Sequence, residues 1–204
     1  MLVASLAVLL LLATQSSSLV QPRVQIYKTA DDLSNALCES LVRAYQTSVA
    51  ERGCFLFTIP GGSILNMLAN LKGSSVVDWS KCKMAYVNHR AVPQDDETST
   101  HFKAQPLFLQ SWQNQGLDVL TLSGSSDAVL EASLYTQKLA ALPQNLAGQP
   151  IFDLSLIGVG LDGHVGSVYP DSAAVEATEN VISVVKTSSQ SISLSLGVML
   201  ASRE

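Results

Sequence analysis

The residues that decide the fold are Phe152–Pro170, FDLSLIGVGLDGHVGSVYP. The first half of this stretch is apolar except for Asp153 and Ser155. A continuous apolar run of this length, ended by glycines, is typical of a strand that is buried on both faces of a sheet. The sequence therefore predicts a buried strand over residues 152–159, with a glycine-rich turn at its carboxyl end.

The turn after this strand contains a candidate catalytic group. Gly158, Gly160 and Gly163 indicate a sharp bend or a close approach of the backbone, and His164 follows Asp162 closely. An open α/β sheet binds its ligand at the carboxyl ends of the strands, where a histidine can transfer protons near neutral pH. We therefore predict a catalytic role for His164. The alternative is a strand-to-helix turn whose histidine only faces solvent, because short motifs often match by accident.

Strands and helices alternate along the rest of the chain. Strand-like runs occur at Val24–Tyr27, Cys54–Ile59, Lys83–Val87, Asp118–Leu122, Glu179–Lys186 and Ser191–Leu196, and helical spacing occurs at about 30–49, after Ser63, around Pro106 and at about 127–142. Such alternation is typical of a parallel sheet in a single domain. We expect one α/β domain over residues 24–204, with a doubly wound, mostly parallel, Rossmann-like sheet and helices on both faces.

A candidate anion site follows the strand at Cys54–Ile59. The next residues are Pro60, Gly61, Gly62 and Ser63, and a helix is expected directly after them. A strand, a glycine pair and a helix start together direct free backbone N–H groups at one place, where a phosphate binds well. This is not a Walker loop, because the Gly-Lys-Ser/Thr ending is absent. A tight connection without a ligand is the alternative explanation.

Three predicted strand ends therefore carry candidate chemistry, namely Gly61–Ser63, Arg90 and Asp162–His164. In a parallel sheet these ends lie on one edge, so we expect them to share a pocket. An anion site, an arginine that can make two parallel hydrogen bonds, and a general base together indicate a reaction on a phosphorylated small molecule.

Composition limits the other function classes. The chain has 204 residues, 47% of them hydrophobic, which is enough for one domain with a core. Its net charge of −5 argues against a nucleic-acid partner, although local basic residues can still bind a small anion. Cys38, Cys54 and Cys82 indicate neither a disulfide framework nor a zinc site, so we expect no metal and three buried, reduced thiols.

The first twenty residues differ from the rest. Leu2–Ala13 is almost wholly aliphatic and Thr14–Ser18 is small and polar, which is typical of a signal peptide and too short to span a bilayer comfortably. We expect residues 1–20 to be a targeting segment that leads to the endoplasmic reticulum, the exterior or a plastid, with no membrane span afterwards. The alternative is a buried N-terminal element in a cytoplasmic protein.

Taken together, these motifs resemble a known family. Gly-Gly-Ser after a strand, an Arg-x-Val-Pro segment, and G-x-G-x-D-G-H-x-x-S-x-x-P resemble 6-phosphogluconolactonase, from about Val24 to Arg203. The resemblance implies hydrolysis of the δ-lactone of 6-phosphogluconate in the oxidative pentose phosphate pathway, without metal or cofactor. It also implies that His164, beside Asp162, is the catalytic base, and that the substrate and its phosphate are bound by Gly61, Gly62, Ser63, Arg90 and Lys186. We expect a monomer.

The sequence departs from the family pattern at several positions. Asn88 and His89 stand where the family has Asp-Glu, and Ser191 stands where it has an arginine that follows Lys186. The chain ends at Glu204, where the family continues into a further strand and helix. We therefore expect the C-terminal part of the sheet to be missing, which exposes a sheet edge and lowers stability.

Three rival functions follow from the same residues. Gly158-x-Gly160-x-x-Gly163 matches a dinucleotide fingerprint, but Pro170 leaves no room for the long helix that should follow. The related amino-sugar-phosphate isomerases and deaminases share the Asp-Gly-His turn but continue with Phe-Asn-Glu-Pro, whereas this chain has Ser-Val-Tyr-Pro at 167–170. The third rival is a truncated relative that binds sugar phosphate without turning it over.

The targeting segment yields a testable prediction. If Leu2–Ala13 directs transport, a peptidase removes it, so the mature protein begins between Thr14 and Val24 and lacks Met1. N-terminal sequencing of the protein from its native source measures this start. An intact Met1 would mean that the segment belongs to the folded domain.

Overall fold

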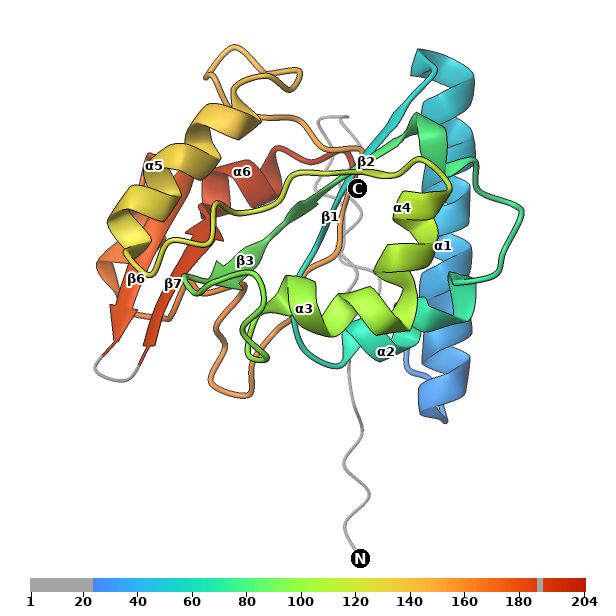
Figure 1. The fold of residues 1–204 in the computed structure, drawn as a ribbon, viewed down its shortest axis with the longest axis horizontal. Helices are drawn as coiled ribbons and strands as arrows, with labels where there is room; N and C mark the ends of the chain where they lie inside the picture. The colour runs from blue at the N-terminus through green and yellow to red at the C-terminus, as the bar shows by residue number, and fades with distance from the viewer. Residues whose placement is uncertain (1–23, 187–188) are drawn as a thin grey trace, which may run out of the picture.

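A four-stranded parallel sheet forms the centre of the fold (Figure 1). In spatial order its strands are β4 (Asp118–Val119), β2 (Cys82–Tyr86), β1 (Phe55–Ile59) and β5 (Leu154–Ser155). All five side chains of β1 are buried, as expected for a strand that is covered on both faces. This computed structural model describes residues 24–186 and 189–204, so the expected targeting segment, residues 1–20, lies outside the described part.

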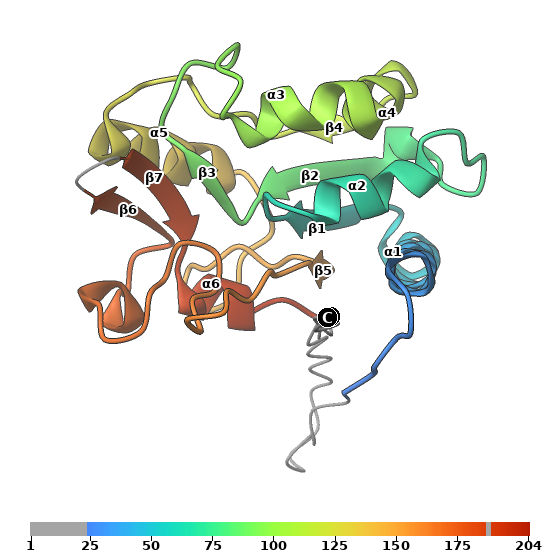
Figure 2. The same cartoon turned by 90° about the horizontal axis from the view of Figure 1, so that it is seen from below.

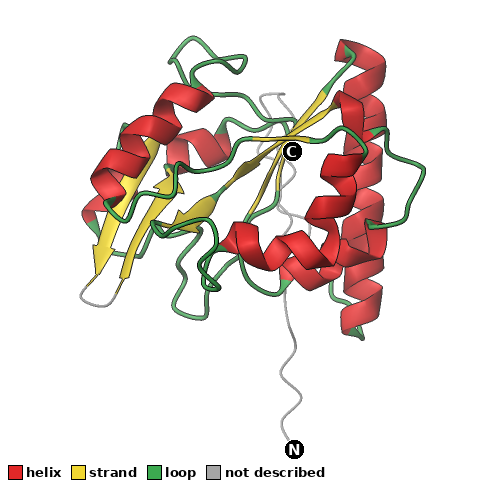
Figure 3. Ribbon diagram, viewed as in Figure 1, coloured by secondary structure: helices red, strands yellow, loops and turns green. Residues whose placement is uncertain are grey.

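A second, antiparallel sheet contains β3 (Asn88–Arg90), β7 (Ser189–Leu194) and β6 (Val181–Lys186), in that spatial order. Figure 3 shows these strands as a group separate from the parallel strands, with β3 following directly on β2. The expectation of one mostly parallel sheet is therefore wrong in part. Only two residues separate β6 from β7, and such a short connection requires antiparallel pairing because parallel neighbours need a long crossover.

The strand expected at residues 152–159 is shorter than predicted. Only Leu154 and Ser155 form β5, at the edge of the described sheet, although Phe152, Leu154 and Leu156 are each no more than 2% exposed. The apolar run therefore predicts burial correctly, but it overestimates the length of the hydrogen-bonded strand. The residues expected as a strand at 24–27 likewise form none.

The two long helices begin and end as their sequences indicate. α1 (Ala30–Arg52) is capped by Thr29, whose Oγ1 accepts from the Asp32 amide at 3.0 Å. It ends at Gly53, whose φ of 76° lies in the left-handed region that glycine tolerates. α5 (Ala128–Leu139) begins after Asp127, whose carboxylate accepts from two amides of the first turn.

The remaining helices are short. They are α2 (Ile64–Leu68), α3 (Thr100–Ala104), α4 (Gln110–Asn114) and α6 (Leu196–Leu200), with 3₁₀ turns at Ala69–Leu71, Trp79–Lys81 and Ala173–Glu176. A π-helical segment, Gln105–Leu109, joins α3 to α4 around Pro106, because proline has no N–H for a regular α-helical bond. Figure 2 shows α3 and α4 over one face of the sheet.

An aromatic cluster fixes α3 and α4 on that face. Trp79 and Trp112 stack with ring centroids 3.8 Å apart, and Phe57 of β1 lies 6.4 and 6.5 Å from them. All three side chains are at most 1% exposed. Buried aromatic pairs of this kind contribute much of the hydrophobic stabilisation of a small core.

Two further observations qualify the sequence-based expectations. Cys38 and Cys82 are buried free thiols, but Cys54 is exposed, because it precedes β1 at the surface. Within residues 24–186 and 189–204, no helix has both the length and the apolar character that a membrane crossing requires.

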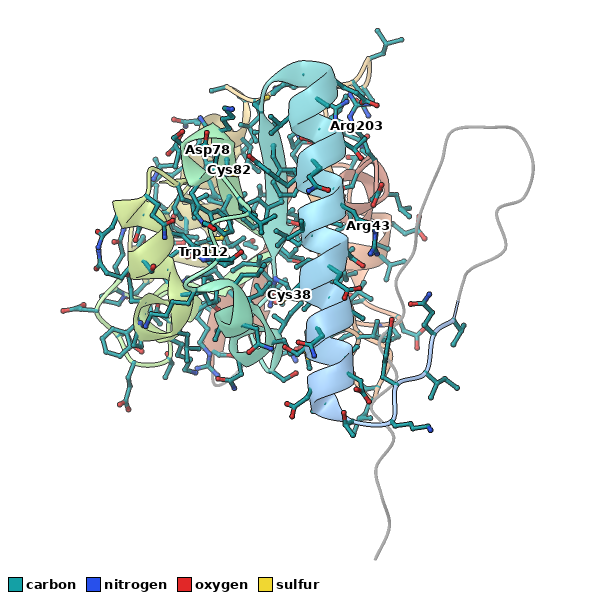
Figure 4. All side chains as sticks on the ribbon, turned by 90° about the vertical axis from the view of Figure 1, so that its right-hand side faces the viewer. Cys38, Arg43, Asp78, Cys82, Trp112 and Arg203 are labelled. Carbon is teal, nitrogen blue, oxygen red and sulfur yellow. The ribbon has the colours of Figure 1, made fainter. Side chains whose placement is uncertain are left out.

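A buried carboxylate holds the amino end of the parallel sheet together. Asp153 is 5% exposed, and its Oδ2 accepts from the Leu56 amide of β1 at 2.8 Å. Its Oδ1 accepts from Arg52 Nη2 at 2.8 Å and lies 3.3 Å from Arg203 Nε. Figure 4 shows Arg203 beside the carboxyl end of α1. Asp153 thereby connects α1, β1 and the last residues of the chain.

This cluster predicts a stability difference between two aspartates. Asp153→Asn removes a buried charge that accepts two hydrogen bonds and pairs with Arg203, so we expect the free energy of unfolding to fall by about 2–3 kcal/mol. Asp118→Asn removes an exposed partner of Lys83, and exposed pairs contribute only about 0–1 kcal/mol. Urea denaturation of both variants measures the difference. Equal losses of unfolding free energy would show that Asp153 stabilises the fold no more than an exposed aspartate does.

Candidate active site

Three loops leave the carboxyl ends of neighbouring parallel strands. β1 lies between β2 and β5, and both neighbours run parallel to it. The loop after β1 contains Gly61–Ser63, the residues after β2 include Asn88–Arg90, and the loop after β5 contains Gly158–His164. The topology therefore brings the three predicted segments to one edge, which is the ligand-binding edge of open α/β sheets.

Backbone hydrogen bonds shape the turn that presents His164. The Gly163 amide donates to the Gly160 carbonyl at 2.9 Å, and the Gly160 amide donates to the His164 carbonyl at 2.8 Å. Gly163 has a φ of 85°, and a Cβ at Gly160 would collide with the His164 imidazole. Both glycines are therefore required, one for its backbone conformation and one for the space that the imidazole occupies.

Asp162 determines which nitrogen of His164 is free. Asp162 Oδ1 lies 2.5 Å from His164 Nδ1, and the hydrogen bond from His164 lowers the pKa of the Asp162 carboxyl. When the imidazole is in its neutral form, the ionised Asp162 accepts the proton of Nδ1, which leaves Nε2 with a free lone pair. The His164 side chain is 32% exposed, so water can reach it. This arrangement suits a general base.

Tyr169 connects His164 with Lys186. The Tyr169 ring centroid lies 4.8 Å from that of His164, and Lys186 Nζ lies 3.2 Å from the same Tyr169 centroid. A cation over an aromatic face is held electrostatically, so the ring keeps the ammonium group near the turn that carries His164. The sequence singled out Lys186 only by resemblance and did not single out Tyr169.

Serine and asparagine side chains join the antiparallel sheet to the same turn. Asn88 Nδ2 donates to Ser167 Oγ at 3.2 Å, and Ser191 Oγ lies 3.5 Å from that oxygen. Ser193 Oγ accepts from the Ser167 amide at 3.1 Å. Arg90 is the register partner of Ser191 across β3 and β7, so its backbone lies beside a residue that contacts Ser167. The Arg90 side chain is exposed, and it forms no ion pair with a described residue.

The Gly61–Ser63 loop offers backbone donors, although its helix is short. The amides of Gly61, Gly62 and Ser63 donate no hydrogen bond within the described part of the chain. Gly62 has a φ of 91°, and α2 has only five residues, so its dipole is weaker than the sequence suggested. A Cβ at Gly61 would lie 2.9 Å from Thr100 Oγ1, which places the loop against the start of α3.

Two other kinds of site find little support. No group of three His, Cys, Asp or Glu side chains among the residues that the structure describes could hold a metal ion. After Gly163 the chain forms isolated bridges between Val159, Val165 and Val168 instead of a helix. The dinucleotide motif requires a helix there, because the pyrophosphate binds at the helix start.

Comparison with known proteins extends these observations. A family model described as "Glucosamine-6-phosphate isomerases/6-phosphogluconolactonase" matches residues 28–204. A 6-phosphogluconolactonase of Mycobacterium tuberculosis is 32% identical over 194 residues, which cover 89% of this chain and 78% of that protein. A rice protein (Oryza sativa subsp. indica) named "Probable 6-phosphogluconolactonase 4, chloroplastic" is 29% identical, and the match covers 81% of this chain and 54% of the rice protein.

A solved structure has the same fold. The 6-phosphogluconolactonase of Trypanosoma brucei superposes with a TM-score of 0.76 at 24% identity, over 88% of this chain and 78% of that one. The match of the family model spans nearly all of the described residues, and it includes all three loops at the sheet edge. This chain therefore belongs to the 6-phosphogluconolactonase family, a family of lactone hydrolases within the broader group that also contains the glucosamine-6-phosphate isomerases.

Proposed function

We propose that this chain hydrolyses 6-phospho-D-glucono-1,5-lactone to 6-phospho-D-gluconate, the second step of the oxidative pentose phosphate pathway. The observation that carries the proposal is the Asp162–His164 pair, whose 2.5 Å contact leaves His164 Nε2 free at a ligand-binding sheet edge. The names of the relatives in M. tuberculosis and rice support the same substrate.

The proposed step needs only water and the side chains of the turn. His164 Nε2 takes a proton from a water molecule as the water oxygen attacks the lactone carbonyl carbon. The bond between that carbon and the ring oxygen then breaks, and the imidazolium returns the proton to the leaving oxygen. Asp162 stabilises the imidazolium while it exists, because its lowered pKa keeps it negatively charged. No metal and no cofactor takes part in this step.

The phosphate of the substrate is bound by cations and amides on either side of the turn. Arg90 supplies a guanidinium that can make two parallel hydrogen bonds, and Lys186 supplies an ammonium group that Tyr169 holds in place. The free amides of Gly61–Ser63 add neutral donors. Ser191 lies opposite Arg90 and contributes a hydroxyl but no charge, so Arg90 and Lys186 supply the charge pairing.

The compartment and assembly state are also proposals. The aliphatic segment at residues 1–20 directs the chain to the secretory pathway or a plastid, and the name of the rice relative places that protein in the chloroplast. We also propose that the protein acts as a monomer.

Replacement of the base tests the mechanism. Wild-type protein should release acid from the lactone faster than the spontaneous reaction, as measured in a pH-stat, and it should release no ammonia from glucosamine 6-phosphate. His164→Ala should lose about 10²–10⁴ of kcat, because a general base contributes that much.

The neighbouring carboxylate gives a second variant for the same test. Asp162→Asn should also lose rate, since an amide can donate to Nδ1 and so leave the proton on Nε2. His101→Ala is the matched control, because His101 lies outside the turn. A His164→Ala variant with normal turnover would contradict the assignment.

Arg90 tests the phosphate site. Arg90→Ala should raise KM for the phosphorylated lactone about tenfold to a hundredfold, since a charge-assisted hydrogen bond contributes about 1.5–3 kcal/mol. Arg90→Lys should recover only part of this, because lysine cannot make the paired bonds. The measurement is the KM of each variant for the phosphorylated lactone.

Two controls accompany this experiment. Glucono-1,5-lactone lacks the phosphate, so Arg90→Ala and wild type should hydrolyse it alike. Arg43→Ala removes another exposed arginine, on α1, and should change neither constant. An equal loss on both lactones in Arg90→Ala would mean that Arg90 supports the fold or the turn instead of the phosphate.

A further inference from the structure

His89 is a buried polar residue to which the proposed reaction assigns no role. It lies in β3 between Asn88 and Arg90 and is only 3% exposed. Its imidazole packs edge-on against Tyr86, with ring centroids 5.0 Å apart. A buried imidazole normally needs partners for both nitrogens, because an unpaired buried polar atom is destabilising.

Both nitrogens of His89 have partners, and these partners fix its protonation state. Nε2 lies 3.1 Å from the amide nitrogen of His101, which can only donate, so Nε2 is the unprotonated acceptor. Ser99 Oγ lies 3.3 Å from the same nitrogen. Nδ1 therefore carries the proton and donates to the Arg90 carbonyl at 2.7 Å. Burial lowers the pKa of His89, which favours this neutral form.

The partners of His89 belong to two elements, β3 and the start of α3, which carry or adjoin the proposed phosphate-binding groups. The Arg90 carbonyl is part of the residue that supplies the guanidinium. The His101 amide and Ser99 belong to the start of α3, which Ser99 also caps through the Phe102 amide at 3.2 Å. Thr100, the first residue of α3, packs against the glycine loop. Its Oγ1 lies 2.9 Å from the position that a Cβ of Gly61 would occupy.

We propose that His89 is a positioning residue that holds Arg90 at a fixed distance from the Gly61–Ser63 loop, and so sets the spacing of the phosphate-binding groups. This inference rests on the proposed function. The imidazole is rigid, and its two nitrogens point to different elements, so it acts as a spacer between β3 and α3. Arg90 has a long side chain that loses conformational freedom when phosphate binds. A fixed Arg90 carbonyl holds the backbone in place beforehand, so less conformational freedom must be lost on binding.

Phenylalanine at position 89 provides the main test. His89→Phe keeps a ring of similar size against Tyr86 but removes the hydrogen bonds of both ring nitrogens. We expect KM for 6-phosphogluconolactone to rise about tenfold with kcat within about twofold of wild type, because the guanidinium and the amides no longer converge. Hydrolysis of glucono-1,5-lactone should stay unchanged. An unchanged KM in the folded variant, or an equal loss on both lactones, would overturn the inference.

Two further variants keep the test decisive. His101→Phe is the matched control, since the His101 side chain contacts Tyr86 and Gln105, and its backbone amide still donates to His89. It should leave KM within about twofold of wild type, and a tenfold rise there would overturn the specific role of His89. His89→Gln retains an acceptor for the His101 amide and should give an intermediate KM. It also replaces His89→Phe as the test if that variant does not fold.

The pH dependence separates positioning from simple packing. The titratable groups that face His89 are His101 from α3, Glu131 from α5 and Tyr86 from β2. Below its lowered pKa, His89 gains a proton on Nε2 and can no longer accept from the His101 amide. Wild-type KM should then approach that of His89→Phe. The substrate phosphate titrates identically in the assays of both proteins. A ratio of the His89→Phe KM to the wild-type KM that stays constant as pH falls would therefore contradict the inference.

The test also distinguishes this inference from the proposed function. If wild type hydrolyses the phosphorylated lactone and His89→Phe matches it, the function stands and the inference fails. If wild type hydrolyses neither lactone, the proposed function fails, and the affinity for inorganic phosphate, measured by calorimetry, still tests His89. Weaker phosphate binding by His89→Phe than by wild type would support the inference, and equal binding would overturn it.

Discussion

The burial of β1 on both faces is the constraint on which the rest of this structure depends. A strand with no exposed side chain must have neighbours on both sides and covering elements above and below. β2 and β5 supply the neighbours, and both run parallel to β1. The carboxyl ends of all three strands therefore reach the same edge, with the Gly61–Ser63 loop in the middle. The position of the site follows from this one packing requirement.

The chemistry of the site arises where the two sheets meet. The turn that carries His164 belongs to the parallel sheet, whereas Arg90 and Lys186 lie in the antiparallel sheet. Ser167 accepts one hydrogen bond from Asn88 of β3, and the Lys186 ammonium lies over the Tyr169 ring, so the turn is held from the second sheet at two points. His164, the candidate base, and Lys186 are thus connected by one set of contacts. Loss of either sheet would separate them.

Electrostatics at this edge differs from that of the whole chain. The net charge is −5, yet the candidate site residues include two cations, Arg90 and Lys186, and the amides of Gly61–Ser63, which donate no hydrogen bond within the described residues. The buried His89 is neutral, because burial lowers its pKa and both nitrogens have suitable partners. A neutral imidazole can connect β3 and α3 without adding a charge that would need compensation. Global charge is therefore a poor guide to the charges at this candidate site.

The sequence alone determined the features that depend on neighbouring residues. The cap at Thr29, the burial of β1 and the glycine turn at His164 were all predictable, because caps, apolar runs and glycines act within a few residues. The antiparallel sheet, the two-residue extent of β5 and the contacts of His89 were not. They are decided by pairing between segments far apart in the chain, and local patterns report which side chains are buried without reporting their partners.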